Sequence, residues 1–283
     1  MKKKQSPSLG IFFWVFSTLL FLPGPCLFAK TSVSNAQIAR LAQELGNNPT
    51  RPLVESLESD WLRDPKLERF DILPLPEETR AIILNWAKNN GCYYAIEPQR
   101  EYYDTVLIFG ARSSVMAMRL RFLEKLFLQG LRTKKLVWLT GKRPLRETEK
   151  RTTPGCTTEE QAARYLWDTH LFSEELRSIP IKFIVADMQW ENDSWKRPST
   201  RDTVNAWKNQ TDPGSCLFIS NQPFCAYQEA TVANLLEEYS FEVVGPKFHS
   251  HYYQAPGAVI LDTLARLLHE RSLCNAQAAA CVY

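Results

Sequence analysis

Short, continuous apolar runs recur along the chain from Asp104 onward, and each ends in a small or polar residue. Runs that are apolar at consecutive positions are typical of strands buried on both faces, as in a parallel sheet covered by helices. The five predicted strands lie at residues 105–110, 135–141, 182–187, 216–221 and 242–245.

The segments between these runs carry apolar residues three and four positions apart, which predicts helices. Alternating strands and helices predict a Rossmann-like α/β domain over residues 101–273, doubly wound around a mostly parallel sheet. A further strand is expected around His249 to Tyr253. The expected helices cover residues 114–129, 159–170, 200–210, 227–239 and 258–271.

Residues 30–100 are predicted to form a helical N-terminal extension. The stretch 37–45 has helical apolar spacing, and the stretch 76–87 opens with a proline and two acids, which are favourable in a first helical turn. The last ten residues, 274–283, form a short tail that carries two cysteines.

The first 29 residues have the layout of a secretory signal. Lys2, Lys3 and Lys4 precede an apolar run from Ile11 to Leu22, which is short for a bilayer-spanning helix of about 20 residues. The sequence therefore predicts export, either with cleavage near Ala29 or with the run kept as a membrane anchor. The expected location is the periplasm or the periplasmic face of a membrane.

The charge balance argues against nucleic acid as a partner. The net charge of +3 is that of the three N-terminal lysines, and the remaining 31 Lys and Arg match 31 Asp and Glu. A nucleic-acid binder would keep a basic surplus in its folded part.

Six cysteines follow the predicted signal, an even number that permits disulfides in an oxidising compartment. Cys274 and Cys281 are spaced to close a loop in the tail, and free buried thiols are the alternative. No two cysteines have the spacing of a zinc or redox motif. His249 and His251 lack a third metal ligand, so no metal site is expected.

Glycine and polar residues follow the predicted strands, at the sheet edge where open parallel sheets bind ligands. Gly110 permits a tight strand-to-helix turn, and the N–H groups of the next helix suit an anion. Arg112 and Arg119 add positive charge. Ordinary turn chemistry explains Gly110 and Gly141 equally well.

The order of these pieces resembles the YdcF/SanA/ElyC-like family of bacterial envelope proteins. The chain has an apolar strand, a helix that carries Arg119 and ends at Gly130, and a Thr140-Gly141 turn. A Thr-Glu-Glu helix start and a Ser-Thr-Arg-Asp segment follow, before a strand that ends in Ser-Asn. The resemblance covers about residues 104–246 and implies a Rossmann-like fold.

The resemblance assigns site residues by position. Glu159, or Glu160 beside it, matches an acid at a helix start, and Asp202 matches a second acid, so Glu159 and Asp202 are the candidate catalytic residues. The ligand-binding candidates, with neighbours at the strand ends included, are Gly110, Arg112, Arg119, Thr140, Gly141, Thr200, Asn221 and Gln228.

Several positions depart from the family pattern. Lys142 replaces a second glycine, Thr203 stands where the family has Asn, and Phe224 falls near the position of a His. Tyr227 or Gln228 falls near the position of an Arg. The chain is therefore either a binding relative of the family or one that uses other polar residues.

Three functions stay open at this point. The resemblance implies a role in peptidoglycan or lipid-carrier metabolism, with a phosphate-bearing envelope intermediate bound or transformed. The alternatives are a non-catalytic module for a nucleotide-like molecule such as S-adenosylmethionine, and an interaction protein that docks through residues 32–90. The sequence assigns no cofactor.

Export has a direct test. N-terminal sequencing of the mature protein is expected to start near Lys30, or to find the apolar run retained in a membrane fraction, because the signal layout targets the chain for translocation. Full-length protein recovered from the soluble cytoplasm would contradict this prediction.

Overall fold

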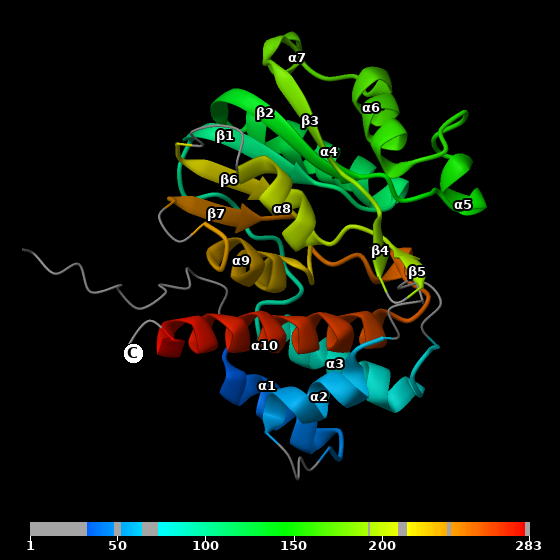
Figure 1. Cartoon of the computed structure of the whole chain (residues 1–283), viewed down its shortest axis with the longest axis vertical. Helices are drawn as coiled ribbons and strands as arrows, with labels where there is room; N and C mark the ends of the chain where they lie inside the picture. Colours follow the sequence, from blue (N-terminus) through cyan, green and yellow to red (C-terminus); the bar gives the residue numbers. More distant parts are fainter. Residues whose placement is uncertain are drawn as a thin grey trace, which may run out of the picture.

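A computed structural model describes residues 33–47, 52–63, 73–191, 193–208, 214–236 and 239–280 (Figure 1). Its centre is a five-stranded sheet in the order β3-β2-β1-β6-β7, and every neighbouring pair is parallel. The predicted Rossmann-like α/β fold is thus confirmed. The strands are β1 (Tyr102–Phe109), β2 (Arg132–Gly141), β3 (Ile181–Ala186), β6 (Cys216–Ile219) and β7 (Phe241–Val244).

The apolar runs form strands because helices cover both faces of the sheet. In β1, Val106 and Ile108 join the apolar cluster on one face, whereas Leu107 and Phe109 join the cluster on the other. All four side chains are at most 1% exposed. Consecutive apolar residues are therefore required, since successive side chains of a strand point to opposite faces.

The helices lie in layers around the sheet (Figure 1). Side chains of α4 and α6 pack on one face, and those of α8 and α9 pack on the other. These helices and two short ones near them are α4 (Ser113–Leu128), α5 (Glu147–Lys150), α6 (Glu159–Thr169), α7 (Glu174–Ser178), α8 (Thr200–Lys208) and α9 (Cys225–Ala233). The helix predicted at residues 227–239 corresponds to α9, which starts two residues earlier and ends six residues earlier.

The N-terminal extension forms an outer layer together with the last helix. Helix α10 (Pro256–Ala280) contacts α9 on one side (Figure 1). On its other side lie three helices of the extension, α1 (Asn35–Glu44), α2 (Leu53–Trp61) and α3 (Glu77–Asn89). Ile38, Leu57 and Ile83 are fully buried in this layer. The apolar face of the described part of the extension is therefore covered by the chain itself.

One expectation near the C-terminus was wrong. Residues Ser250–Tyr252 form a single 3-10 turn rather than a strand, because the parallel sheet already ends at β7. The last helix continues through residue 274 to Ala280, so the described part of the tail is helical.

No disulfide joins the cysteines of the described ranges. All five of these cysteines, Cys92, Cys156, Cys216, Cys225 and Cys274, are buried, in line with the alternative of small apolar residues. Burial raises the pKa of Cys225 to about 12, so its thiol stays protonated and is a poor nucleophile. Cys281, the expected partner of Cys274, lies outside the described residues, as does the predicted signal at residues 1–29.

Within the described ranges, no helix combines the length and the apolar character needed to cross a bilayer.

The strand order creates a switch point between β1 and β6. The chain moves from β1 outward to β2 and β3, then returns past β1 to form β6 and β7 on the other side. The connections after β1 and β6 therefore leave in opposite directions and open a crevice at the carboxyl ends of these two strands. This crevice holds the candidate site.

Candidate functional site

A cavity of about 360 Å³ lies at the switch point, lined by Phe109 and Gly110 at the end of β1 and by residues of α8, α9 and α10. Among the described residues, seven cationic side chains and one carboxylate, that of Glu159, line it. The cationic residues are Arg63, Arg112, Arg119, Arg143, Lys196, Arg197 and Arg266. Such a lining favours an anionic ligand.

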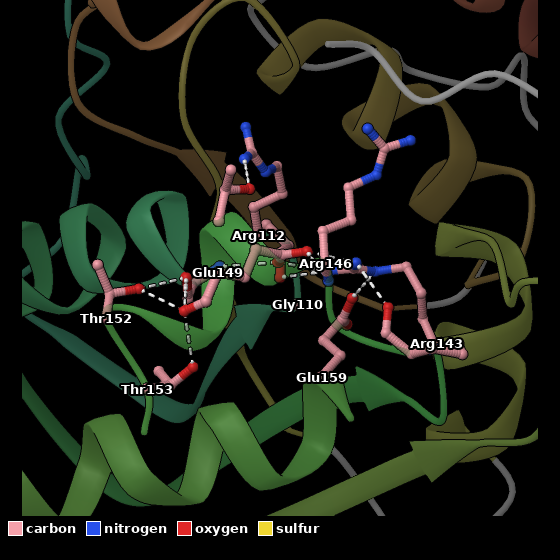
Figure 2. Close-up of polar contacts among 12 residues, drawn as sticks. Gly110, Arg112, Arg143, Arg146, Glu149, Thr152, Thr153 and Glu159 are labelled. Atoms are coloured by element: carbon pink, nitrogen blue, oxygen red, sulfur yellow. Dashed lines mark hydrogen bonds and ion pairs between the residues drawn. The ribbon is translucent and has the colours of Figure 1, made fainter. Parts of the chain in front are cut away.

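Arg143 anchors one wall of the cavity through two carboxylates (Figure 2). Its terminal nitrogens lie 2.9 Å from each oxygen of Glu149, and its Nε lies 3.0 Å from Oε2 of Glu159. The same guanidinium donates to the carbonyls of Pro144 and Ala111. All five N–H groups are thereby engaged, so Arg143 organises the wall and has no donor left for a ligand.

Burial sets the protonation of this network. Desolvation alone would lower the pKa of Arg143, but Glu149 and Glu159 outweigh it and raise that pKa. Desolvation opposes the charge of Glu149, yet its contacts with Arg143 keep its pKa below the ordinary value. For Glu159 desolvation prevails over Arg143, so its pKa is raised. Glu159 is therefore the lining group best suited to hold or release a proton.

Gly110 is required by the close approach of Glu159. A Cβ atom at position 110 would collide with Oε1 of Glu159 and would also lie 2.7 Å from the carbonyl oxygen of Leu139. A glycine at the end of β1 thus leaves room for the carboxylate beside the backbone (Figure 2).

Arg119 bridges the ends of β1 and β6 from the second turn of α4. Its Nε and one terminal nitrogen donate to Oδ1 of Asn221 at 3.0 and 2.7 Å. The other terminal nitrogen donates to the carbonyls of Phe109 and Gly110 at 2.6 and 3.0 Å. Because Arg119 is only 2% exposed, it braces the two strands as well as lining the cavity.

A second arginine pair meets the cavity from the outer helical layer. Asp262 of α10 is fully buried and accepts two hydrogen bonds of 3.1 Å from Arg266, one turn along the helix. Nε of Arg63, just after α2, lies 3.9 Å from the same carboxylate, and the backbone N–H of Arg63 donates to it. One carboxylate therefore holds two lining arginines in place.

A small hairpin closes another side. Strands β4 (Gln189–Glu191) and β5 (Ser194–Lys196) pair antiparallel, and Gln189 is paired with Lys196. Lys196 lines the cavity, whereas Trp190 and Trp195 form a cross-strand pair. Since successive side chains alternate across a strand, the two tryptophans lie on the opposite face of the hairpin.

Neutral side chains form the remaining wall. The Tyr227 hydroxyl lies 2.7 Å from Oγ1 of Thr200, which also accepts from Gln228. The side-chain oxygen of Gln228 accepts from Ser220 at the end of β6. Phe224, Tyr253 and Leu62 add apolar surface. This wall suits the uncharged part of a ligand.

Six of the ten residues assigned from the sequence line this cavity. They are Gly110, Arg112, Arg119, Glu159, Thr200 and Gln228. Three of the positions that depart from the pattern of the resemblance, Thr203, Phe224 and Tyr227, line it as well, whereas Lys142 does not. The strands that end near Gly110, Gly141 and Asn221 are neighbours, because β1 pairs with both β2 and β6.

The other four residues support the cavity from outside its lining. Oγ1 of Thr140 donates to the carbonyl of Ile184, and Gly141 leaves room for the ring of Pro198. Asn221 is fully buried and holds Arg119. The carboxylate of Asp202 accepts from the backbone and hydroxyl of Ser199 and from Gln189, so it caps α8 and anchors the hairpin.

Sequence reasoning missed Arg143, Glu149, Arg63, Arg266 and Asp262. Arg143 stands two residues after Gly141, the last residue of β2, so its position just beyond a strand end was an available signal. Arg63 and Asp262 lie 199 positions apart and sit in segments that carry no motif. Only the docking of the outer helical layer brings them to the sheet edge.

No family model, curated protein or solved structure matches this chain significantly.

The two carboxylates on Arg143 are predicted to differ in their effect on stability. Glu149→Gln should lower the free energy of unfolding at pH 7 by about 3 kcal/mol, because it breaks a buried bidentate ion pair. Glu159→Gln should lower it by less than about 1 kcal/mol, because the change also removes a desolvated charge. Urea unfolding of both variants measures the difference.

The pH dependence of the unfolding free energy is a control for the role of the Glu149 carboxylate. A carboxylate whose folded pKa is lowered, as for Glu149, adds stability above its unfolded pKa, and this stability is lost as the pH falls. The deficit of Glu149→Gln relative to wild type should therefore shrink in acid. Equal losses for the two variants, or a deficit independent of pH, would contradict this assignment.

Substitutions of Arg119 and Arg112 are predicted to have different effects on stability, because Arg119 joins two strand ends whereas Arg112 lies at the rim of the cavity. Arg119→Met should lower the free energy of unfolding by about 3 kcal/mol, because it leaves Asn221 and two carbonyls without their donor. Arg112→Met should change it by less than about 1 kcal/mol, because Arg112 is half-buried and its bond to Thr148 is exposed. Thermal and urea unfolding distinguish the two, and a mild effect at Arg119 would refute the bracing role.

Proposed function

We propose that this protein binds a phosphate-bearing small molecule in the cavity at the switch point of its sheet. The observation that carries the proposal is the lining, in which seven cationic side chains face one carboxylate across the described part of the chain. Phosphate groups combine high negative charge with several acceptor oxygens, which matches guanidinium donors. The volume of about 360 Å³ suits a compact organic phosphate.

Arg112 and the start of α4 form the part of the site best placed for a phosphate. Arg112 is the N-cap residue of this 16-residue helix, and the Glu149 carboxylate already accepts from the N–H of Ser113, its first residue. The helix N-terminus carries partial positive charge and outward N–H groups, and Val115 in its first turn lines the cavity. The backbone and the arginine therefore attract an anion to the same place.

The charge of the cavity lining and the burial of the N-terminal extension disfavour the two alternative functions, S-adenosylmethionine binding and protein docking. S-adenosylmethionine carries a sulfonium cation, which seven cationic neighbours would disfavour. Docking through the N-terminal extension is disfavoured because Ile38, Leu57 and Ile83, at the centres of the apolar faces of α1, α2 and α3, are fully buried within the chain. Should the bound molecule be transformed, the raised pKa of Glu159, caused by its burial, suits it to proton transfer.

The biological setting follows from the resemblance to the YdcF/SanA/ElyC-like family and from the predicted signal. We propose an exported protein of the cell envelope whose ligand is a phosphate-bearing intermediate of peptidoglycan or lipid-carrier metabolism. The near-neutral charge of the chain after its first lysines supports a small-molecule partner rather than nucleic acid.

Native mass spectrometry tests the proposal. Mature protein isolated in phosphate-free buffer is expected to retain a phosphorus-containing ligand, which denaturation should release. Arg112→Gln should reduce ligand occupancy, since losing a charge-assisted hydrogen bond weakens binding by about tenfold. The matched control is Arg80→Gln, because Arg80 pairs with Glu77 on α3 and does not line the cavity.

Two outcomes would overturn the proposal. One is protein that carries no ligand and is not stabilised against heat by inorganic phosphate or phosphate esters. The other is a retained sulfonium compound, which would favour the S-adenosylmethionine alternative. Equal loss of ligand in Arg112→Gln and Arg80→Gln would move the site away from the cavity.

A further inference from the structure

Glu159 contributes the one carboxylate found among the described residues that line the cavity. The residue is the first of α6 and is 9% exposed. Its Oε2 accepts from Nε of Arg143 at 3.0 Å, whereas its Oε1 accepts no hydrogen bond from any residue that the structure describes. One oxygen of a buried carboxylate is therefore open to a donor from outside the chain.

This open oxygen lies beside the backbone of Gly110, at the end of β1. A Cβ atom at position 110 would meet Oε1 before any other atom, and both residues line the cavity. Although Glu159 is buried as a residue, Oε1 keeps accessible surface of its own and is not among the sealed polar atoms of the described structure. A molecule in the cavity can therefore reach this oxygen.

The carboxylate of Glu159 is short of hydrogen-bond donors for its charge. Arg143 and Arg197 attract the negative charge, yet desolvation outweighs them and raises the pKa of Glu159. A hydrogen bond donated to Oε1 compensates such desolvation. Because seven cationic side chains already line the cavity, the donor that suits this place is a neutral O–H or N–H group rather than an ammonium.

The uncharged part of the lining suits a small molecule with several hydroxyl groups. Thr200, Tyr227 and Gln228 carry polar groups that both donate and accept, as the hydroxyls of a ligand do. The rings of Phe224 and Tyr253, with centroids 6.2 Å apart, offer apolar surface to C–H groups. In a cavity of about 360 Å³, one compact molecule that fills the space touches the carboxylate and the cationic lining together.

We propose that the ligand is a hydroxyl-bearing phosphate ester of the sugar phosphate class, and that Glu159 selects it by accepting a hydrogen bond from a ligand hydroxyl at Oε1. This inference rests on the proposed function and names its ligand class. The cationic lining holds the phosphoryl group, and the carboxylate distinguishes a polyol ester from an apolar ester of the same shape. Glu159 is thus a specificity-determining residue as well as a partner of Arg143.

A matched pair of ring phosphates tests this selection. Inositol monophosphate and cyclohexyl phosphate share a cyclohexane ring and one phosphate, and they differ in the hydroxyl groups. The purified full chain is titrated calorimetrically at pH 7 with both compounds, with inorganic phosphate and with free inositol. The wild-type protein should bind inositol monophosphate about tenfold more tightly than cyclohexyl phosphate, because only the former donates to the charged carboxylate.

Substitutions of Glu159 should change the preference rather than phosphate binding as such. Glu159→Gln should lower the preference by about threefold or more, because a neutral hydrogen bond replaces a charge-assisted one. Its affinity for cyclohexyl phosphate should stay the same or rise, because a negative charge has been removed beside an anion. Glu159→Leu should abolish the preference, because it leaves no acceptor at this place.

Glu160→Gln is the matched control. Glu160 is the next residue of α6, pairs with Arg164 and does not line the cavity, so this variant should keep the wild-type preference. The comparison of two adjacent carboxylates separates a local contact from a general effect of charge. Circular dichroism of each variant checks that the fold is retained.

The outcomes separate this inference from the proposed function. Equal binding of the two ring phosphates, or a preference unchanged in Glu159→Gln, would overturn the selection by Glu159 and leave the phosphate site in place. A preference that falls as far in Glu160→Gln as in Glu159→Gln would overturn it as well. Binding of free inositol with no phosphate probe bound would refute the proposed function alone, and failure of every probe would refute both.

Discussion

The cavity depends on the hydrogen bonds by which the guanidinium of Arg119 joins the carboxyl ends of β1 and β6. Strands β1 and β6 are neighbours, but the chain leaves their carboxyl ends in opposite directions. Arg119 ties the two ends together through the carbonyls of Phe109 and Gly110 and the side chain of Asn221. A charge with this little exposure is tolerated because hydrogen bonds compensate its desolvation, and the resulting brace gives the crevice a defined width.

Charged groups at this edge divide into those that shape the cavity and those that face a ligand. The Glu149–Arg143–Glu159 network uses every donor of Arg143 internally, and Gly110 makes room for its outer carboxylate. Arg112, the hairpin residues and the arginines held by Asp262 provide positive charge around the empty volume. The cavity is thus rigidly supported and electrostatically one-sided, as expected of a site for anions.

The outer helical layer gives this Rossmann-like protein its particular site. Leu62 and Arg63, just after α2, and Arg266 of α10 line the cavity at the switch point together with residues of α8 and α9. Arg63 and Arg266 thereby complete a wall, and Asp262 sets their positions from a fully buried place on α10. The same helices bury the apolar residues of the extension, so packing and site formation are coupled.

The amino-acid sequence by itself determined the sheet and its edge. Continuous apolar runs can be satisfied only by strands covered on both faces, and the residues after Phe109 and Ile219 must then lie at one edge. Gly110 and Arg112 were predictable at the cavity for that reason, because a strand end and a helix start are local signals. Glu159, Thr200 and Gln228, which also line the cavity, were assigned through the order of motifs in the family resemblance.

Only the tertiary structure decided how each of these groups is used. Asp202, a candidate catalytic acid, bonds locally to Ser199 at the start of α8 and lies outside the cavity lining. Arg119, a candidate ligand contact, lines the cavity and also donates to Asn221, 102 positions away. The meeting of Arg63 with Asp262 depends on how a helical layer docks, which apolar spacing permits but does not specify. Periodicity reports which face of an element is buried, whereas the pairing of charges depends on which faces meet.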